Sequence, residues 1–196
     1  MTGRSALGWS ILFAGLAAFL LATGIPRLLA ALAMLPGNPA LAEIEEGKPV
    51  DATALALLID GRQEARRYVA DPRLNTDVAL AELLQIDQQA LGDREPRVLL
   101  DRAIDQLRLG LAAAPANSFA WARLAHALAL QGGRDEAALA AWRLSIATAP
   151  AEPKLAAWRA KFADDRVKQL APSDIRLLTQ QLQYALRFKA QGVNWH

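Results

Sequence analysis

The sequence predicts an all-α protein with one membrane-spanning helix near its N-terminus. Hydrophobic residues make up 53% of the 196 residues, and alanine and leucine, both strong helix formers, supply most of the excess. Aromatic residues reach only 6%, and β-branched residues are sparse. No stretch alternates apolar and polar residues with the period of a strand. Together these observations favour helices throughout.

The first expected element is a membrane anchor. Residues 6–25 carry no charge, and nine of them are Leu, Ile or Phe. Twenty helical residues extend about 30 Å, the thickness of a hydrocarbon core, and Trp9 near one end suits the interface. We expect one span over residues 6–25, inside an anchor and interfacial segment of residues 1–35.

The flanking charges predict how the anchor is oriented. Arg4 and the amino group precede the span, whereas Glu43, Glu45 and Glu46 follow it. The positive-inside rule therefore predicts a single-pass protein of the bacterial inner membrane, with a cytoplasmic N-terminus and a periplasmic C-terminal domain. Pro26 is expected to end the helix, so that residues 28–35 lie along the membrane surface.

Two other interpretations of the apolar segment remain open. A cleaved signal peptide would use the small-x-small sequence of residues 31–33, but that site lies far beyond a normal signal core, and the apolar run is long for one. A buried helix in a soluble core would not need a continuous apolar surface. A retained anchor is therefore favoured.

The rest of the chain divides into a linker and a helical domain. Two prolines and a glycine within residues 34–39 indicate a linker, which we assign to residues 36–50, followed by the domain at residues 51–196. Breakers and caps bound the expected helices, with Thr76, Ser118 and Ser173 as candidate N-caps. The helices are expected at residues 51–59, 63–70, 76–91, 96–113, 119–130, 135–149, 153–163 and 173–189.

Charge is divided unevenly along the chain. Residues 36–101 hold 13 acidic and 7 basic side chains, and residues 102–196 hold 7 acidic and 13 basic. The halves either steer a partner or are two solvated surfaces of unequal sign. The basic half has no dense Lys/Arg run interleaved with aromatic residues, so we expect no binding of nucleic acid.

An internal repeat fits the second half of the chain. With Ser118 as the first position of a 34-residue unit, Trp121, Leu124 and Ala125 fall at positions 4, 7 and 8, and Ala137 falls at position 20. The unit before it places Ala103, Leu107, Gly110, Leu111 and Pro115 at positions 20, 24, 27, 28 and 32. Small residues at such positions let paired antiparallel helices approach closely, while large ones fill the seam to the next pair.

This pattern resembles the tetratricopeptide repeat (TPR), with the best match over residues 102–150. The chain departs from the pattern at Pro150, one position late, at Leu128 in place of an aromatic residue, and over residues 84–95. The resemblance implies a TPR-like domain of antiparallel helix pairs, an α-solenoid, behind the anchor. A non-repeating helical bundle is the alternative.

The resemblance also implies a partner-binding groove. Phe119, Ala122 and His126 fall at positions that face the groove in the family, and Ala129 and Leu130 extend this apolar surface. His126 is either a peptide contact or a packed surface histidine, and Trp121, Trp142 and Trp158 are either core residues or anchors for a partner. Ala122 and His126 replace the Lys and Asn with which some relatives hold a terminal carboxylate. A mostly apolar groove would suit an apolar helix or strand.

No motif for catalysis or for cofactor binding is present. The chain has no cysteine, two histidines, no phosphate-binding glycine loop and no nucleophile elbow. Paired carboxylates fall at expected caps and loops. We therefore expect no enzyme, no catalytic residue, no cofactor, no metal and no small-molecule substrate.

The layout resembles that of membrane-anchored TPR proteins of the bacterial envelope. The favoured function is a non-catalytic scaffold or adaptor that binds membrane or periplasmic proteins during exopolysaccharide synthesis or export. A cytochrome c maturation factor that binds apoprotein, and a structural accessory subunit of a large membrane complex, are alternatives. The small residues Ser10, Ala14 and Ala18 on one face of the span agree with the last of these.

Overall fold

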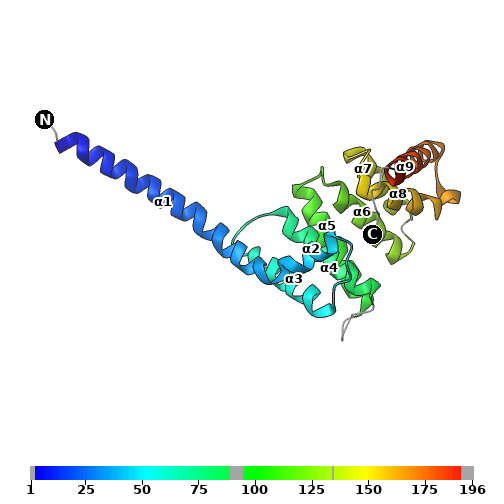
Figure 1. Ribbon diagram of the computed structural model, residues 1–196, viewed down its shortest axis with the longest axis horizontal. Coiled ribbons are helices and arrows are strands. Elements are labelled where there is room, and N and C mark those ends of the chain that lie inside the picture. The colour runs from blue at the N-terminus through cyan, green and yellow to red at the C-terminus, as the bar shows by residue number, and fades with distance from the viewer. Residues whose placement is uncertain (1–2, 89–94, 134, 191–196) are drawn as a thin grey trace.

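The computed structural model describes residues 3–88, 95–133 and 135–190, with side chains from residue 12 onward together with that of Trp9. Within these ranges every regular element is a helix (Figure 1). The α-helices are α1 Gly3–Met34, α2 Asn38–Glu45, α3 Ala52–Ala65, α4 Pro72–Asp87, α5 Pro96–Ala113, α6 Ser118–Gln131, α7 Asp135–Thr148, α8 Pro153–Asp164 and α9 Pro172–Ala190. Short 3₁₀ helices, η1 Leu35–Gly37 and η2 Val167–Gln169, complete the set.

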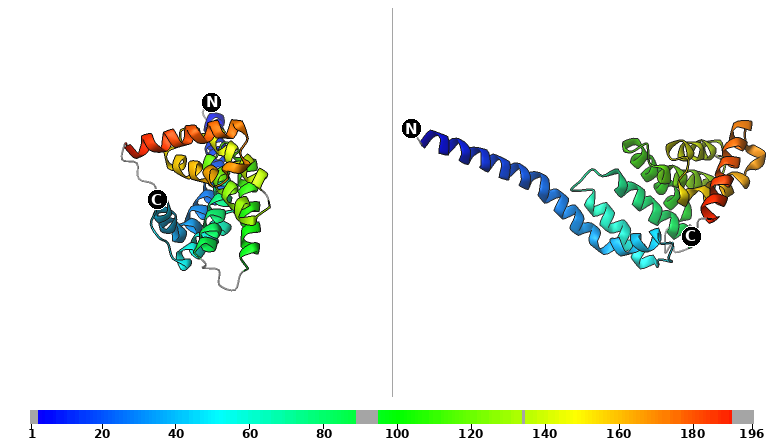
Figure 2. Two further views of the ribbon diagram at one scale, coloured as in Figure 1. Left: turned by 90° about the vertical axis from the view of Figure 1, so that its right-hand side faces the viewer. Right: turned by 45° about the horizontal axis from the view of Figure 1, so that its top comes forward.

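Helix α1 projects from a compact body formed by the other helices (Figures 1 and 2). It is long and apolar enough to cross a membrane, and its large apolar side chains, from Trp9 to Leu32, are exposed. Pro26 lies inside this helix and does not end it. The expectation that residues 28–35 leave the helix to lie along the surface is therefore wrong, since α1 continues to Met34.

The end of α1 is packed into the body, because η1, α2 and α3 close around it. We call the region formed by residues 30–45 and α3 the joint. Ala30 is 2% exposed and clusters with Ala65 and Leu74, while Ala40 and Val50 are buried in a second cluster with α3 and α4. Much of the segment assigned to a linker, residues 36–50, is therefore helical and part of the core.

Two glycines explain why the predicted breaks are absent. A Cβ atom on Gly37 would lie 2.5 Å from the Cα of Leu58, and one on Gly61 would lie 2.7 Å from the carbonyl oxygen of Ala33. Each glycine therefore allows two backbones to approach closely. Instead of dividing residues 51–59 from residues 63–70, Gly61 lies inside the single helix α3.

Helix α4 begins earlier than expected. Asp71 accepts a hydrogen bond from the amide of Arg73 and caps the helix, and Pro72 occupies its first turn. Thr76, the candidate cap, is instead 3% exposed within α4. Helix α4 ends at Asp87, and residues 89–91 of the expected helix lie outside the described residues.

Consecutive helices pack on one another through most of the body. The contacts join α3 to α4, α4 to α5, α5 to α6, α6 to α7, and α8 to α9. The main core is built from residues of all six helices from α4 to α9 and includes Leu107, Leu124, Leu139 and Trp142. Gly110 is a true close-approach residue, since a Cβ there would lie 2.7 Å from Cγ2 of Thr76 on α4.

The register of α7 differs from the repeat alignment by one residue. Ala137, placed at position 20, is exposed, whereas Ala138 is fully buried. The cap of α6 is likewise one residue early, because Asn117, and not Ser118, accepts a hydrogen bond from the amide of Ala120.

Candidate partner-binding groove

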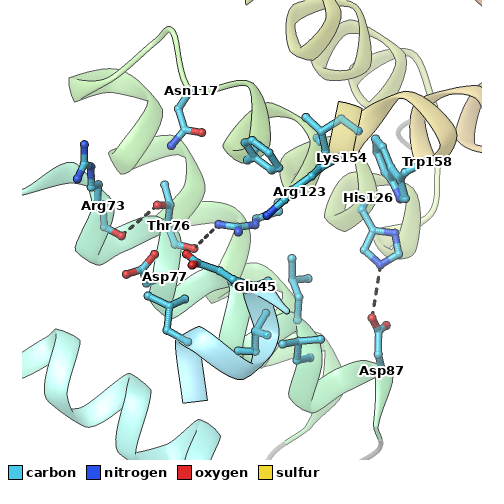
Figure 3. A pocket seen from close by; sticks show the side chains of 18 residues that line it. Glu45, Arg73, Thr76, Asp77, Asp87, Asn117, Arg123, His126, Lys154 and Trp158 are labelled. Carbon is cyan, nitrogen blue, oxygen red and sulfur yellow. Dashed lines mark hydrogen bonds and ion pairs between the residues drawn. The ribbon is translucent and has the colours of Figure 1, made fainter. Parts of the chain in front are cut away.

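An open cavity runs along the first helices of successive helix pairs. It has a volume of about 770 Å³ and is lined by side chains of α2, α4, α6 and α8 (Figure 3). Its apolar wall comprises Leu41, Ile44, Leu80, Leu83, Leu84, Phe119, Ala122, Leu155 and Trp158. We call this cavity the groove.

All five predicted partner-binding residues lie on α6 and line either the groove or the cavity beside it. Phe119, Ala122 and His126 line the groove. Ala129 and Leu130 line a second cavity of about 270 Å³, which His126 and Trp158 also line. The helical spacing of the five residues brings them to one connected surface, with His126 at the meeting point of the two cavities.

The three tryptophans have different environments. Trp142 is fully buried in the main core, and its indole nitrogen donates to the carbonyl of Arg159 at 3.0 Å. Trp121 packs against the core half-buried and donates to the carbonyl of Pro115 at 2.8 Å. Trp158 stands at the groove, stacked on Phe162 with ring centroids 5.0 Å apart. Of the three, Trp158 is therefore the one that a groove ligand would touch.

The groove is also charged, which the expectation of a mostly apolar surface missed. Arg123 reaches across from α6 and donates to the carbonyl of Thr76 at 3.3 Å (Figure 3). Burial lowers the pKa of Arg123, an effect that Asp77 and Glu45 partly oppose through their negative charge. Lys154 and Arg73 also line the groove.

The helical period contains the signal that would have found Arg123. Phe119, Ala122, Arg123 and His126 stand at the i, i+3, i+4 and i+7 positions of α6, which form one face of a helix. Assigning the groove by family positions selected the first, second and fourth residues and omitted the third. A face drawn from the period alone would have included all four.

His126 forms a contact across the groove. Its Nε2 atom lies 3.8 Å from Oδ2 of Asp87 at the far end of α4 (Figure 3). The contact is an ion pair only when the imidazole is protonated. His126 therefore links α4 to α6 at the groove rim while its ring stays half-buried.

A buried polar network fixes the helices that carry the groove. Arg159 on α8 donates from Nε to the Ser145 hydroxyl at 3.0 Å and from Nη1 to the Ala149 carbonyl at 2.8 Å. The Ser145 hydroxyl in turn donates to the carbonyl of Ser118 at 2.9 Å. Through this chain of hydrogen bonds α7 holds the start of α6 and the middle of α8 in place.

The last helix is held by a bidentate ion pair. Arg143 on α7 donates to both carboxylate oxygens of Asp174 on α9, at 2.8 and 2.9 Å. Asp174 also accepts from the amide of Ala171, and Arg143 holds the pKa of Asp174 below its ordinary value. The pair fixes α9 against α7, away from the groove.

The lining of the groove is chemically mixed. It combines a long apolar wall, aromatic side chains and charges of both signs. Among the described residues, no group of three or more His, Asp or Glu side chains is placed to hold a metal ion.

The chain was compared with protein-family models, with curated proteins and with solved structures. None of the three comparisons finds a match.

Proposed function

We propose that this protein is a non-catalytic, membrane-anchored adaptor with a TPR-like domain, whose groove binds a segment of a partner protein. Helix α1 would cross the membrane once, and the pairs α4–α5, α6–α7 and α8–α9 would be successive repeat units. One observation carries the proposal: the first helices of these three pairs, α4, α6 and α8, line one cavity.

The length of the groove supports a polypeptide ligand. The groove extends over four helices, α2, α4, α6 and α8, and the second cavity continues it past His126. An amphipathic segment that sets apolar side chains against Phe119 and Trp158 would fit this shape.

Photo-cross-linking in cells tests the proposal directly. A photoreactive amino acid at position 119 should yield one discrete cross-linked partner, because Phe119 lines the groove. The matched control is position 144, since Leu144 is an exposed apolar residue on α7 that does not line the groove. Equal products from both positions, or none from position 119, would contradict the proposal.

A pair of charge substitutions measures the groove contribution to affinity. Phe119→Glu should weaken retention of the cross-linked partner at least about tenfold, the effect of about 1.4 kcal/mol at an anchor residue. Leu144→Glu introduces the same charge outside the groove and should leave retention unchanged. Equal losses in the two variants would assign the effect to folding.

Localisation and pathway belong to the same proposal. We place the protein in a bacterial inner membrane with the domain in the periplasm, which reporter fusions at both termini would test. Exopolysaccharide synthesis or export remains the favoured pathway. A pull-down with a C-x-x-C-H peptide tests the cytochrome c alternative, and recovery of a stoichiometric complex in mild detergent would instead favour the accessory subunit.

A further inference from the structure

We propose that the turn between α3 and α4 rests on the membrane surface beside α1, where Arg66, Arg67 and Arg73 bind the phosphate groups of anionic phospholipids. Arg66 and Arg67 lie outside the groove, whereas Arg73 also lines it. The proposed contact does not depend on partner binding. It rests on one part of the proposed function, the insertion of α1 into the bilayer.

The direction of α3 brings this turn back toward the membrane. Gly37 faces Leu58, Gly61 faces Ala33, and Ala65 clusters with Ala30, so residue numbers rise along α3 as they fall along α1. The two helices are therefore antiparallel, and the C-terminal end of α3 points toward the N-terminal part of α1. Figure 2 shows this turn beside α1 at the edge of the body.

The helical rise gives the height of the turn above the hydrocarbon core. Residues 66–68 follow Gly61 by five to seven positions, so they lie level with about residues 26–28 of α1. The predicted span ends at Ile25, which puts the turn about 2–5 Å beyond it at a rise of about 1.5 Å per residue. A headgroup layer is about 5–8 Å thick on each side. The turn therefore lies at headgroup level.

The side chains at this level have the chemistry of a headgroup site. Arg66, Arg67 and Arg73 are exposed, and Arg27 is exposed on α1 at the same height. Guanidinium groups match phosphate oxygens in a bidentate geometry. Tyr68, 37% exposed, adds an aromatic side chain of the kind found at membrane interfaces.

Nearby polar contacts leave this end of the body basic. Arg66 donates to Gln106 at 2.9 Å, and Arg67 pairs with Glu64 at 2.9 Å, while Asp71 caps α4. The four arginines at this level, the three of the turn together with Arg27, thus outnumber the two carboxylates, so the end of the body beside α1 keeps a positive balance.

The opposite end of the body is acidic. Glu43 and Glu46 lie at the end of α2, Asp51 caps the start of α3, and Asp87 ends α4, all remote from the turn that contains Arg66. Lys48 offsets Glu46 through a 2.6 Å ion pair. The acidic balance of residues 36–101 is therefore concentrated away from the membrane. An anionic bilayer favours this orientation.

Single spin labels in the full-length chain test the contact. The chain has no cysteine, so Ala70→Cys in the turn and Glu43→Cys at the acidic end each give one labelling site. The labelled protein is reconstituted into nanodiscs of phosphatidylcholine with or without phosphatidylglycerol, and collision with a water-soluble nickel chelate is measured. With phosphatidylglycerol, the label at position 70 should be at least about fivefold less accessible than the label at position 43, the factor expected for a single arginine near an anionic surface.

Charge variants with a matched control decide the cause of the shielding. The triple variant Arg66→Gln, Arg67→Gln and Arg73→Gln should expose the label at position 70, as should phosphatidylcholine alone or high salt. Substituting the exposed Arg97, Arg176 and Arg187 by Gln removes the same charge elsewhere and should preserve the shielding. Circular dichroism confirms that both variants keep their helices.

Three results would overturn the inference. The first is equal accessibility of the labels at positions 70 and 43 in the unaltered chain. The second is shielding of position 70 that persists in the triple variant. The third is an equal loss of shielding in the control set. Failure of the protein to enter nanodiscs would instead remove the premise that α1 is a span, and it would leave the binding properties of the groove as a separate question.

Discussion

A buried arginine holds each of two regions of this molecule together, and the two arginines are satisfied in different ways. In the joint, Arg62 is 3% exposed and forms an ion pair with Asp77 on α4 at 3.0 Å. It also donates to the Asn38 side chain at 3.0 Å and to the carbonyl of Met34. One guanidinium therefore connects α1, α2, α3 and α4.

In the region of helices α5–α9, Arg159 is 0% exposed and donates to neutral groups: the Ser145 hydroxyl, the Ser145 carbonyl and the Ala149 carbonyl. These carbonyls belong to the C-terminal end of α7, where the helix dipole favours a positive charge. Burial lowers the pKa of Arg159 to about 10, so the group remains protonated at neutral pH. The comparison teaches that Arg62 ties α1 and α2 to the body by hydrogen bonds while its charge is paired with Asp77. In contrast, a cationic helix cap fixes α8 to α7.

The largest effect is expected from Arg159→Met. The substitution leaves the buried carbonyls of Ser145 and Ala149 without a donor, which should lower the free energy of unfolding by about 3 kcal/mol. Chemical unfolding in detergent followed by circular dichroism measures the loss. Arg176→Met, at an exposed position, is the control, and equal losses in the two variants would contradict the role given to the cap.

The next effect tests the joint. Gly61→Ala places a methyl group against the Ala33 carbonyl and should lower the free energy of unfolding by about 2 kcal/mol, although alanine is the better helix former. Gly15→Ala meets no atom within 4 Å and should leave stability unchanged or slightly raised. The two variants are compared by thermal unfolding, and the same response in both would show that α1 does not pack on α3.

A smaller effect should depend on pH. Because Arg143 lowers the pKa of Asp174 in the folded protein, the pair contributes fully above the ordinary value of 3.8 and is lost as the pH falls through the lowered pKa. Asp174→Asn should lower the free energy of unfolding by about 1–2 kcal/mol at neutral pH. The unfolding temperature of the variant should also fall less steeply than that of the unaltered protein as the pH is lowered. An equally steep fall in the variant would contradict this assignment.

The smallest change in the free energy of unfolding is expected at an exposed ion pair. Lys161 and Asp165 form an exposed ion pair at 3.4 Å on the surface of α8. Lys161→Ala should change the free energy of unfolding by less than about 0.5 kcal/mol. A loss as large as that of the Arg159 variant, measured under the same conditions, would contradict this ranking of buried over exposed charges.

The sequence predicted the helices and buried residues of α5 and α6 better than it predicted the joint, for a physical reason. Leu107, Gly110 and Leu124 recur with the spacing of paired helices, so their burial follows from a local period. A local reading takes Gly37, Gly61 and Pro26 as helix breakers. The two glycines are instead required because distant backbones pass too close for a side chain, and Pro26 lies inside α1. Such contacts between remote segments leave no local pattern.

The groove was predicted in part. The five residues chosen on α6 line it or the adjoining cavity, because one helix face follows from the period. The α8 contribution of Trp158, and the charge of Arg123, Asp77 and Glu45, depend on how four helices meet. That meeting is decided by buried contacts such as the Arg159 cap, which no spacing in the sequence reveals.

Hydrogen exchange of the full-length protein in a bilayer tests the central claim that the anchor and the body are joined rigidly. The account predicts that amides of residues 30–45 and 57–65 exchange as slowly as those of α5 and α6, because both regions are helical and packed. Exchange of residues 30–45 within seconds, beside a protected α5 and α6, would show a flexible linker and would contradict the account.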